Sequence, residues 1–149
     1  MLEIKVRNPG AELTSVKFNG KERLHDGKTF WDRQAPILFP TVGRLRDNKT
    51  VIEGKEYKIP QHGFAKDMDF ELIEKTKNKE IYELKSNEET LKKYPFKFVL
   101  NIEYEFTEDI LTTKIRVINK DDKNMIFGLG GHPGFKLEMP QEEYYFELE

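Results

Sequence analysis

The chain has 149 residues with nearly balanced charges: 25 Lys and Arg residues against 27 Asp and Glu residues, a formal net charge of −2. There is no basic excess to favour nucleic acid or an anionic membrane as partners, and the absence of cysteine excludes disulfides, thiolate chemistry and cysteine-ligated zinc. The length suits one domain over residues 1–149. The sequence has neither an apolar signal peptide nor a stretch of ~20 apolar residues, so we expect a cytoplasmic protein.

Two hairpins are predicted in the first half of the chain. Residues 50–59 place β-forming residues on both sides of a tight turn at Glu53-Gly54-Lys55. Residues 70–84 contain alternating apolar side chains around a polar tip at Lys77-Asn78-Lys79. Both segments therefore indicate antiparallel strand pairs.

A short helix and two longer strands are expected next. Residues 86–94 begin with a Ser or Asn suited to capping and end before Pro95, which predicts a single helix. Residues 96–106 and 111–117 alternate apolar and polar side chains with the period of two that is typical of strands. The predicted fold class is all-β, an antiparallel β-sandwich.

The C-terminal part also has the character of strands. After a polar turn over 119–124, residues 125–129 predict a strand that leads into a glycine-rich motif. Residues 142–149 still alternate like a strand where the chain stops. We therefore expect either a longer protein or a homodimer in which this last strand pairs with a second copy.

Two of the three histidines lie in glycine-containing motifs with aromatic neighbours, Gln61-His62-Gly63-Phe64-Ala65-Lys66 and Gly130-Gly131-His132-Pro133-Gly134-Phe135. An imidazole with a pKa of about 6.5 can give or accept a proton near neutral pH. Each motif is compatible with a catalytic position and with a plain structural turn. The third histidine, His25, lies in a polar turn, where we expect it to be solvated and without a role. Neither motif has carboxylates at metal-ligand spacing, and we expect no metal and no cofactor.

Residues 31–46 form an apolar segment that carries three arginines. Most arginines are surface charges, but guanidinium groups beside Trp31 and Phe39 would suit the hydroxyls and ring face of a sugar. Arg33 is the first candidate, and Arg44 or Arg46 the second.

Together these motifs resemble the aldose 1-epimerase (galactose mutarotase-like) family, and most closely its LacX-like branch. The resemblance rests on the order and spacing of five stretches that span nearly the whole chain: Asn8–Leu13, Trp31–Leu45, Pro60–Lys66, Tyr94–Phe98 and Gly130–Phe135. It implies a β-supersandwich with a sugar cleft, and an enzyme that interconverts the α and β anomers of an aldose.

The resemblance also implies roles for individual residues. His132 corresponds to the histidine that protonates the ring oxygen, and His62 to the one that binds nearby oxygens. Lys66 stands where related sugar-phosphate members often carry arginine. The expected substrate contacts are Arg33, Arg44, Gln61, Phe64, Lys66 and Phe135.

One part of the family pattern is missing from this sequence. Family members are about twice as long, and their catalytic glutamate and a substrate-binding aspartate lie beyond the second histidine motif. The glutamates at the C-terminus, Glu142, Glu143, Glu147 and Glu149, are too close to that motif to be this base. The chain is therefore expected to be the N-terminal half of such a domain. The alternative is a non-catalytic carbohydrate-binding half-domain, completed in some cases by a second chain.

Overall fold

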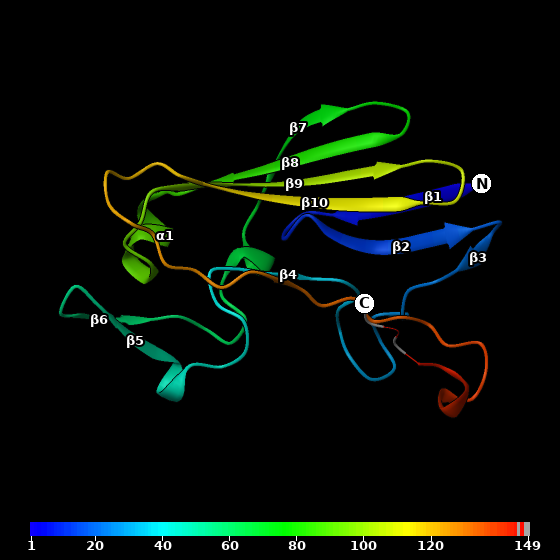
Figure 1. Ribbon diagram of the computed structural model, residues 1–149, viewed down its shortest axis with the longest axis horizontal. Helices are drawn as coiled ribbons and strands as arrows, with labels where there is room; N and C mark the ends of the chain where they lie inside the picture. Colours follow the sequence, from blue (N-terminus) through cyan, green and yellow to red (C-terminus); the bar gives the residue numbers. More distant parts are fainter. Residues whose placement is uncertain (146, 148–149) are drawn as a thin grey trace.

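The computed structural model describes residues 1–145 and 147, and these residues form mainly short antiparallel strands (Figure 1). The strands are β1 (Leu2–Arg7), β2 (Glu12–Phe18), β3 (Lys21–Glu22), β4 (Ile37–Leu38), β5 (Lys49–Ile52), β6 (Lys55–Lys58), β7 (Glu71–Lys75), β8 (Lys79–Lys85), β9 (Phe98–Phe106), β10 (Leu111–Asn119) and β11 (Gly130–Gly131). The helices are α1 (Glu88–Lys93) and the 3₁₀ turns η1 (Arg46–Asn48), η2 (Ala65–Asp67) and η3 (Gln141–Glu143).

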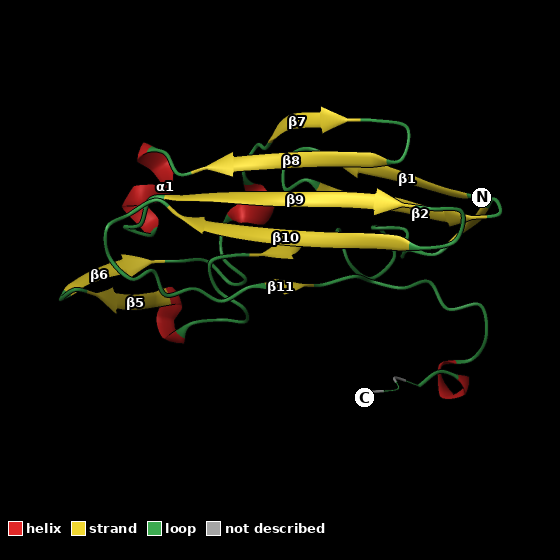
Figure 2. Cartoon of the chain, turned by 45° about the horizontal axis from the view of Figure 1, so that its top comes forward, coloured by secondary structure: helices red, strands yellow, loops and turns green. Residues whose placement is uncertain are grey.

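The strands form four antiparallel sheets. The largest has the order β10-β9-β8-β7, and a second has the order β1-β2-β3. Two smaller pairs, β5-β6 and β11-β4, complete the arrangement. Figure 2 shows the four long strands side by side, with the β5-β6 hairpin apart from them at one end. The all-β antiparallel prediction and both predicted hairpins are confirmed.

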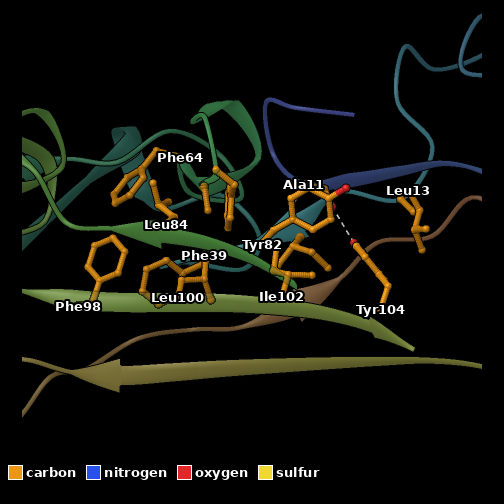
Figure 3. Packing of buried hydrophobic residues seen from close by; sticks show 14 of the residues in the cluster. Ala11, Leu13, Phe39, Phe64, Tyr82, Leu84, Phe98, Leu100, Ile102 and Tyr104 are labelled. Carbon is orange, nitrogen blue, oxygen red and sulfur yellow. Dashed lines mark hydrogen bonds between the residues drawn. The ribbon is translucent and has the colours of Figure 1, made fainter. Parts of the chain in front are cut away.

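The core lies against one face of the four-stranded sheet. Along β9, Phe98, Leu100, Ile102 and Tyr104 all point inward and are at most 1 % exposed, because alternate residues of a strand face the same side. Figure 3 shows these side chains packed with Leu13 of β2, with Tyr82 and Leu84 of β8, and with Phe39 and Phe64, which follow β4 and His62 in the chain. The Tyr104 hydroxyl donates to the Ala11 carbonyl oxygen at 2.7 Å, which ties the two larger sheets together.

The predicted short helix is confirmed as α1. The Asn87 side chain accepts hydrogen bonds from the backbone amides of Glu89 and Thr90 at 2.9 and 3.0 Å, and the Thr90 hydroxyl oxygen accepts from the Asn87 amide at 2.8 Å. This reciprocal cap fixes where the helix begins. The helix ends at Lys93, before Pro95, as the sequence predicts.

Two strand predictions near the C-terminus are wrong for the described residues. Residues 125–129 are irregular and are held by single hydrogen bonds, such as Gly128 N to the Pro40 oxygen at 2.7 Å, because no neighbouring strand pairs along them. In the predicted strand 142–149, residues 141–143 form η3, residues 144, 145 and 147 are not in a strand, and residues 146, 148 and 149 lie outside the described residues. The strand on which a homodimer was predicted is therefore absent from the described part.

Within the described residues, no helix combines the length and the apolar character needed to cross a lipid bilayer.

Candidate functional site

The two histidine motifs meet although they lie far apart in the sequence. Strand β4 brings them together, because Ile37 pairs with Gly131 on one side while Phe39 bridges to Gly63 on the other. The backbone amide of His132 also donates to the Pro36 oxygen at 3.1 Å. As a result, the ring centroids of His62 and His132 are 5.5 Å apart, with an interplanar angle of 68°.

The turn that carries His62 is held close to the backbone of β4 and its flanking residues. The Phe39 carbonyl oxygen accepts hydrogen bonds from the amides of Phe64 and Ala65 at 3.0 and 3.1 Å. A Cβ atom on Gly63 would lie 2.0 Å from that oxygen, and the φ of Gly63 is +72°. His62 itself has a φ of 65°, a conformation that non-glycine residues rarely adopt. The orientation of the His62 imidazole therefore depends on a backbone arrangement that only glycine at position 63 permits.

A chain of polar contacts leads to the His62 ring. The Gly43 backbone amide donates to Nδ1 of His62 at 3.1 Å, and the His62 amide donates to the Gly43 oxygen at 2.8 Å. On the other side of the ring, Nε2 lies 3.3 Å from Nε2 of Gln61. The Gln61 oxygen Oε1 accepts from Nε and Nη2 of Arg44 at 3.2 and 2.7 Å. Three of the predicted site residues are therefore adjacent.

The environment of His62 favours its neutral form. Burial lowers the pKa of His62 below its ordinary value of 6.5, and the positive charges of His132 and Lys66 lower it further. Because the folded chain disfavours the protonated form, His62 contributes to stability above pH 6.5, and this contribution is lost as the pH falls through the lowered pKa.

An NMR titration of the histidine ring protons checks this assignment. We expect His62 to titrate below 6.5 in the wild-type chain, and His132→Gln to move the pKa of His62 upward by removing a neighbouring positive charge. The control Lys114→Met, in β10, should leave the titration unchanged. A wild-type pKa for His62 at or above 6.5 would contradict the assignment.

His132 is exposed and lies against an aromatic neighbour. Its ring centroid is 4.9 Å from that of Trp31, with an interplanar angle of 52°. His25 supports this arrangement, because its Nε2 lies 3.1 Å from the Trp31 carbonyl oxygen and its amide donates to the Gly134 oxygen at 2.8 Å. The expectation that His25 is solvated is therefore wrong: its side chain is 18% exposed, and its hydrogen bonds join the Trp31 segment to the second histidine motif.

Arg33 is engaged by the protein itself. Its Nη1 donates to Oε2 of Glu12 at 3.1 Å and to the Lys66 oxygen at 3.0 Å, and its Nη2 pairs with Asp67. Lys66 is similarly occupied, with Nζ donating to the Gly63 oxygen at 2.9 Å and to Oδ2 of Asp67 at 2.7 Å. Both side chains therefore hold the His62 turn, and the substrate contacts predicted for them would require these bonds to be exchanged.

The other four residues singled out from the sequence have different surroundings. Phe64 is 2 % exposed and Phe39 is fully buried, so both support the site from within the core and offer no face to a ligand. Phe135 is 59 % exposed and bridges to Leu24. Arg46 begins the exposed turn η1. Nowhere among the described residues do three His, Cys, Asp or Glu side chains gather as a metal site would require.

Comparison with known proteins decides the family. The family model described as "Aldose 1-epimerase" matches residues 1–147. The chain belongs to the aldose 1-epimerase family. It is 32% identical over 152 residues to the plasmid protein LacX of Lactococcus lactis subsp. lactis, covering 97% of this chain and 51% of that protein. The chromosomal LacX protein of the same organism is 31% identical over the same shares of the two chains.

Solved structures of aldose 1-epimerase relatives share the fold. A galactose mutarotase related enzyme from Lactobacillus acidophilus superimposes with a TM-score of 0.90 at 42% identity, over 97% of this chain and 49% of that one. A galactose mutarotase-like protein from Lactobacillus casei gives a TM-score of 0.88 at 36% identity, over 95% and 49%. The chain therefore spans about half the length of the relatives that it matches.

Sequence reasoning missed two contributors to the candidate site. Glu12, the buried partner of Arg33, was noticed only as part of a family motif. Its one signal is a charge next to the apolar residues Ala11 and Leu13 in a segment that becomes β2. The Gly43 amide carries no sequence signal at all, since every residue except proline has one.

Proposed function

We propose that this chain forms the histidine-bearing side of a sugar site that interconverts the α and β anomers of an aldose. The observation that carries the proposal is the meeting of His62 and His132, whose ring centroids are 5.5 Å apart although their motifs are distant in sequence. Family membership supplies the reaction class. The exposed His132 ring beside Trp31 offers an acid next to an aromatic surface on which a sugar ring packs.

The proposed reaction opens and recloses the sugar ring. A base takes the proton of the anomeric hydroxyl, the C1–ring oxygen bond breaks with its electron pair moving to the ring oxygen, and His132 donates a proton to that oxygen. Rotation about the C1–C2 bond presents the other face of the aldehyde. On ring closure the proton on the ring oxygen side returns to His132, and the base returns its proton to the former carbonyl oxygen, which forms the opposite anomer. His62, held neutral, binds substrate oxygen without competing for the transferred proton.

A second candidate function is binding of a sugar without turnover. Among the described residues, neither ring of the pair forms an ion pair or hydrogen bond with a carboxylate that could act as the base of the reaction. A chain with the acid alone would bind an aldose and accelerate its opening weakly, since a single acid or base typically contributes about 10²- to 10⁴-fold.

Polarimetry of freshly dissolved α-glucose or α-galactose separates these functions. We expect the wild-type chain to speed the change in optical rotation, and His132→Ala to return the rate to that of sugar alone. The control Glu103→Gln, which alters a surface ion pair with Lys114, should behave like wild type. Saturable shifts of the His62 and His132 NMR signals without any rate effect would favour the binding function. No shift and no rate effect would contradict both.

A further inference from the structure

We propose that Arg44 is a positioning residue: it turns the Gln61 side-chain amide so that its N–H group and the Nε2–H group of His62 converge on one bound oxygen atom. The inference rests on the proposed function for the identity of the ligand, a sugar. It assigns Arg44 a different role from the direct substrate contact predicted from the sequence.

The orientation of the Gln61 amide follows from the chemistry of Arg44. A guanidinium group has only donors, and two of them, Nε and Nη2, reach the same Gln61 atom at 3.2 and 2.7 Å. That atom must therefore be the amide oxygen. If it were the amide nitrogen, its N–H groups would face the N–H groups of Arg44, and no hydrogen bond could form. The Gln61 nitrogen is consequently directed toward His62.

The tautomer of His62 follows from the backbone. The Gly43 amide is a donor and lies 3.1 Å from Nδ1, so Nδ1 must offer its lone pair. The reciprocal hydrogen bond from the His62 amide to the Gly43 oxygen, at 2.8 Å, fixes the position of the two residues relative to each other. A neutral imidazole has one N–H group, which therefore lies at Nε2. Burial and the nearby positive charges keep the ring in this neutral form by lowering its pKa.

These two assignments leave a pair of donors without an acceptor between them. The Nε2 atoms of His62 and Gln61 are 3.3 Å apart and both carry hydrogen. Such a contact gains nothing in the free protein, but an oxygen placed between the two atoms would accept from both. A sugar oxygen fits this position, because an ether, carbonyl or hydroxyl oxygen has two lone pairs and can accept from both donors.

Arg44 prevents an alternative hydrogen bond within the protein, from the His62 Nε2–H group to the Gln61 side-chain oxygen. Without the guanidinium group, the Gln61 amide would be free to rotate by 180° and to accept the His62 Nε2–H through its own oxygen. The donor pair would then be lost. Arg44 is exposed, and its contact with Gln61 can therefore be altered without disturbing the core.

The first test needs no ligand. Long-range ¹H–¹⁵N correlation spectra at a pH where His62 is neutral should show the proton on Nε2 in the wild-type chain. Nuclear Overhauser contacts should join the Gln61 side-chain N–H protons to the His62 ring. In Arg44→Met these contacts should disappear while the tautomer stays the same. Arg44→Lys should keep them, because an ammonium group is also a pure donor. A proton on Nδ1, or unchanged contacts in Arg44→Met, would overturn the proposal.

The second test uses glucose and galactose as probes, followed through the same His62 signals. We expect Arg44→Met and Gln61→Leu to weaken binding roughly 3- to 10-fold, the range for one lost neutral hydrogen bond. Arg44→Lys should remain within about twofold of wild type. Equal losses in Arg44→Met and Arg44→Lys would show that the guanidinium group itself binds the sugar, and would overturn the positioning role. If neither sugar binds the wild-type chain, the proposed function fails, while the tautomer and orientation are still decided by the first test.

Discussion

Gly63→Ala is expected to lower the free energy of unfolding by about 3 kcal/mol or more, and to displace His62 from His132. The added Cβ would lie 2.0 Å from the Phe39 oxygen and 2.7 Å from the Pro40 nitrogen, and both are backbone atoms that cannot rotate away. The same oxygen accepts the amides of Phe64 and Ala65, so any shift also breaks the hydrogen bonds that hold the turn. Urea unfolding measures the loss of stability, and the NMR signals of His62 report the change at the site.

Gly54→Ala is the matched control for this change. Gly54 has a φ of +78°, close to the +72° of Gly63, but a Cβ there meets nothing within 4 Å. It should cost only the backbone penalty of about 1 kcal/mol. If the two variants lose the same free energy of unfolding, the close approach between the His62 turn and Phe39 does not contribute to stability.

Glu12→Gln is expected to have the second large effect, a loss of about 3 kcal/mol in the free energy of unfolding. The Glu12 side chain is fully buried, and its carboxylate accepts from Arg7 at 2.6 Å, from Arg33 at 3.1 Å, and from the amides of Gln34 and Ala35 at 2.7 and 3.1 Å. An amide in its place removes the negative charge and directs its own N–H groups toward some of these donors, which then lose their acceptor. Urea unfolding provides the measurement.

The control for Glu12→Gln is the same substitution in an exposed ion pair. Glu89 is 61% exposed and pairs with Lys93 at 2.7 Å on the surface of α1. Glu89→Gln should cost no more than about 0.5 kcal/mol, as is usual for such pairs. A loss in Glu12→Gln no greater than this would mean that the buried carboxylate adds nothing net to stability.

Glu12 also changes how Arg33 is understood. An arginine near aromatic residues suggested a group that is free to bind a sugar. In the folded chain that arginine connects β2 to the turn η2 through Glu12, Lys66 and Asp67. Its side chain therefore holds the His62 turn in place, and the polar groups that contact the imidazole are the Gly43 amide and the Gln61 side chain.

Local spacing along the chain was enough to predict several features of the fold. The alternation over residues 96–106 was enough to place Phe98, Leu100 and Tyr104 in the core, because a strand repeats every two residues. The cap at Asn87 and the glycine turn at residues 53–55 are likewise local, and both formed as predicted. The two histidine motifs also stood out, because glycine and proline limit what the backbone around them can do.

Only the tertiary structure decided which distant segments meet. The strands β1 and β2 escaped prediction, and residues 125–129 were predicted as a strand that does not form, because pairing depends on whether a partner lies alongside. The distance between His62 and His132 depends on the two-residue strand β4, whose neighbours are set by hydrogen bonds across the fold. Likewise, whether Arg33 is free or bound depends on Glu12, 21 positions away. The spacing of residues in the sequence does not predict such contacts, because burial and hydrogen bonding between remote residues arise only when the chain has folded.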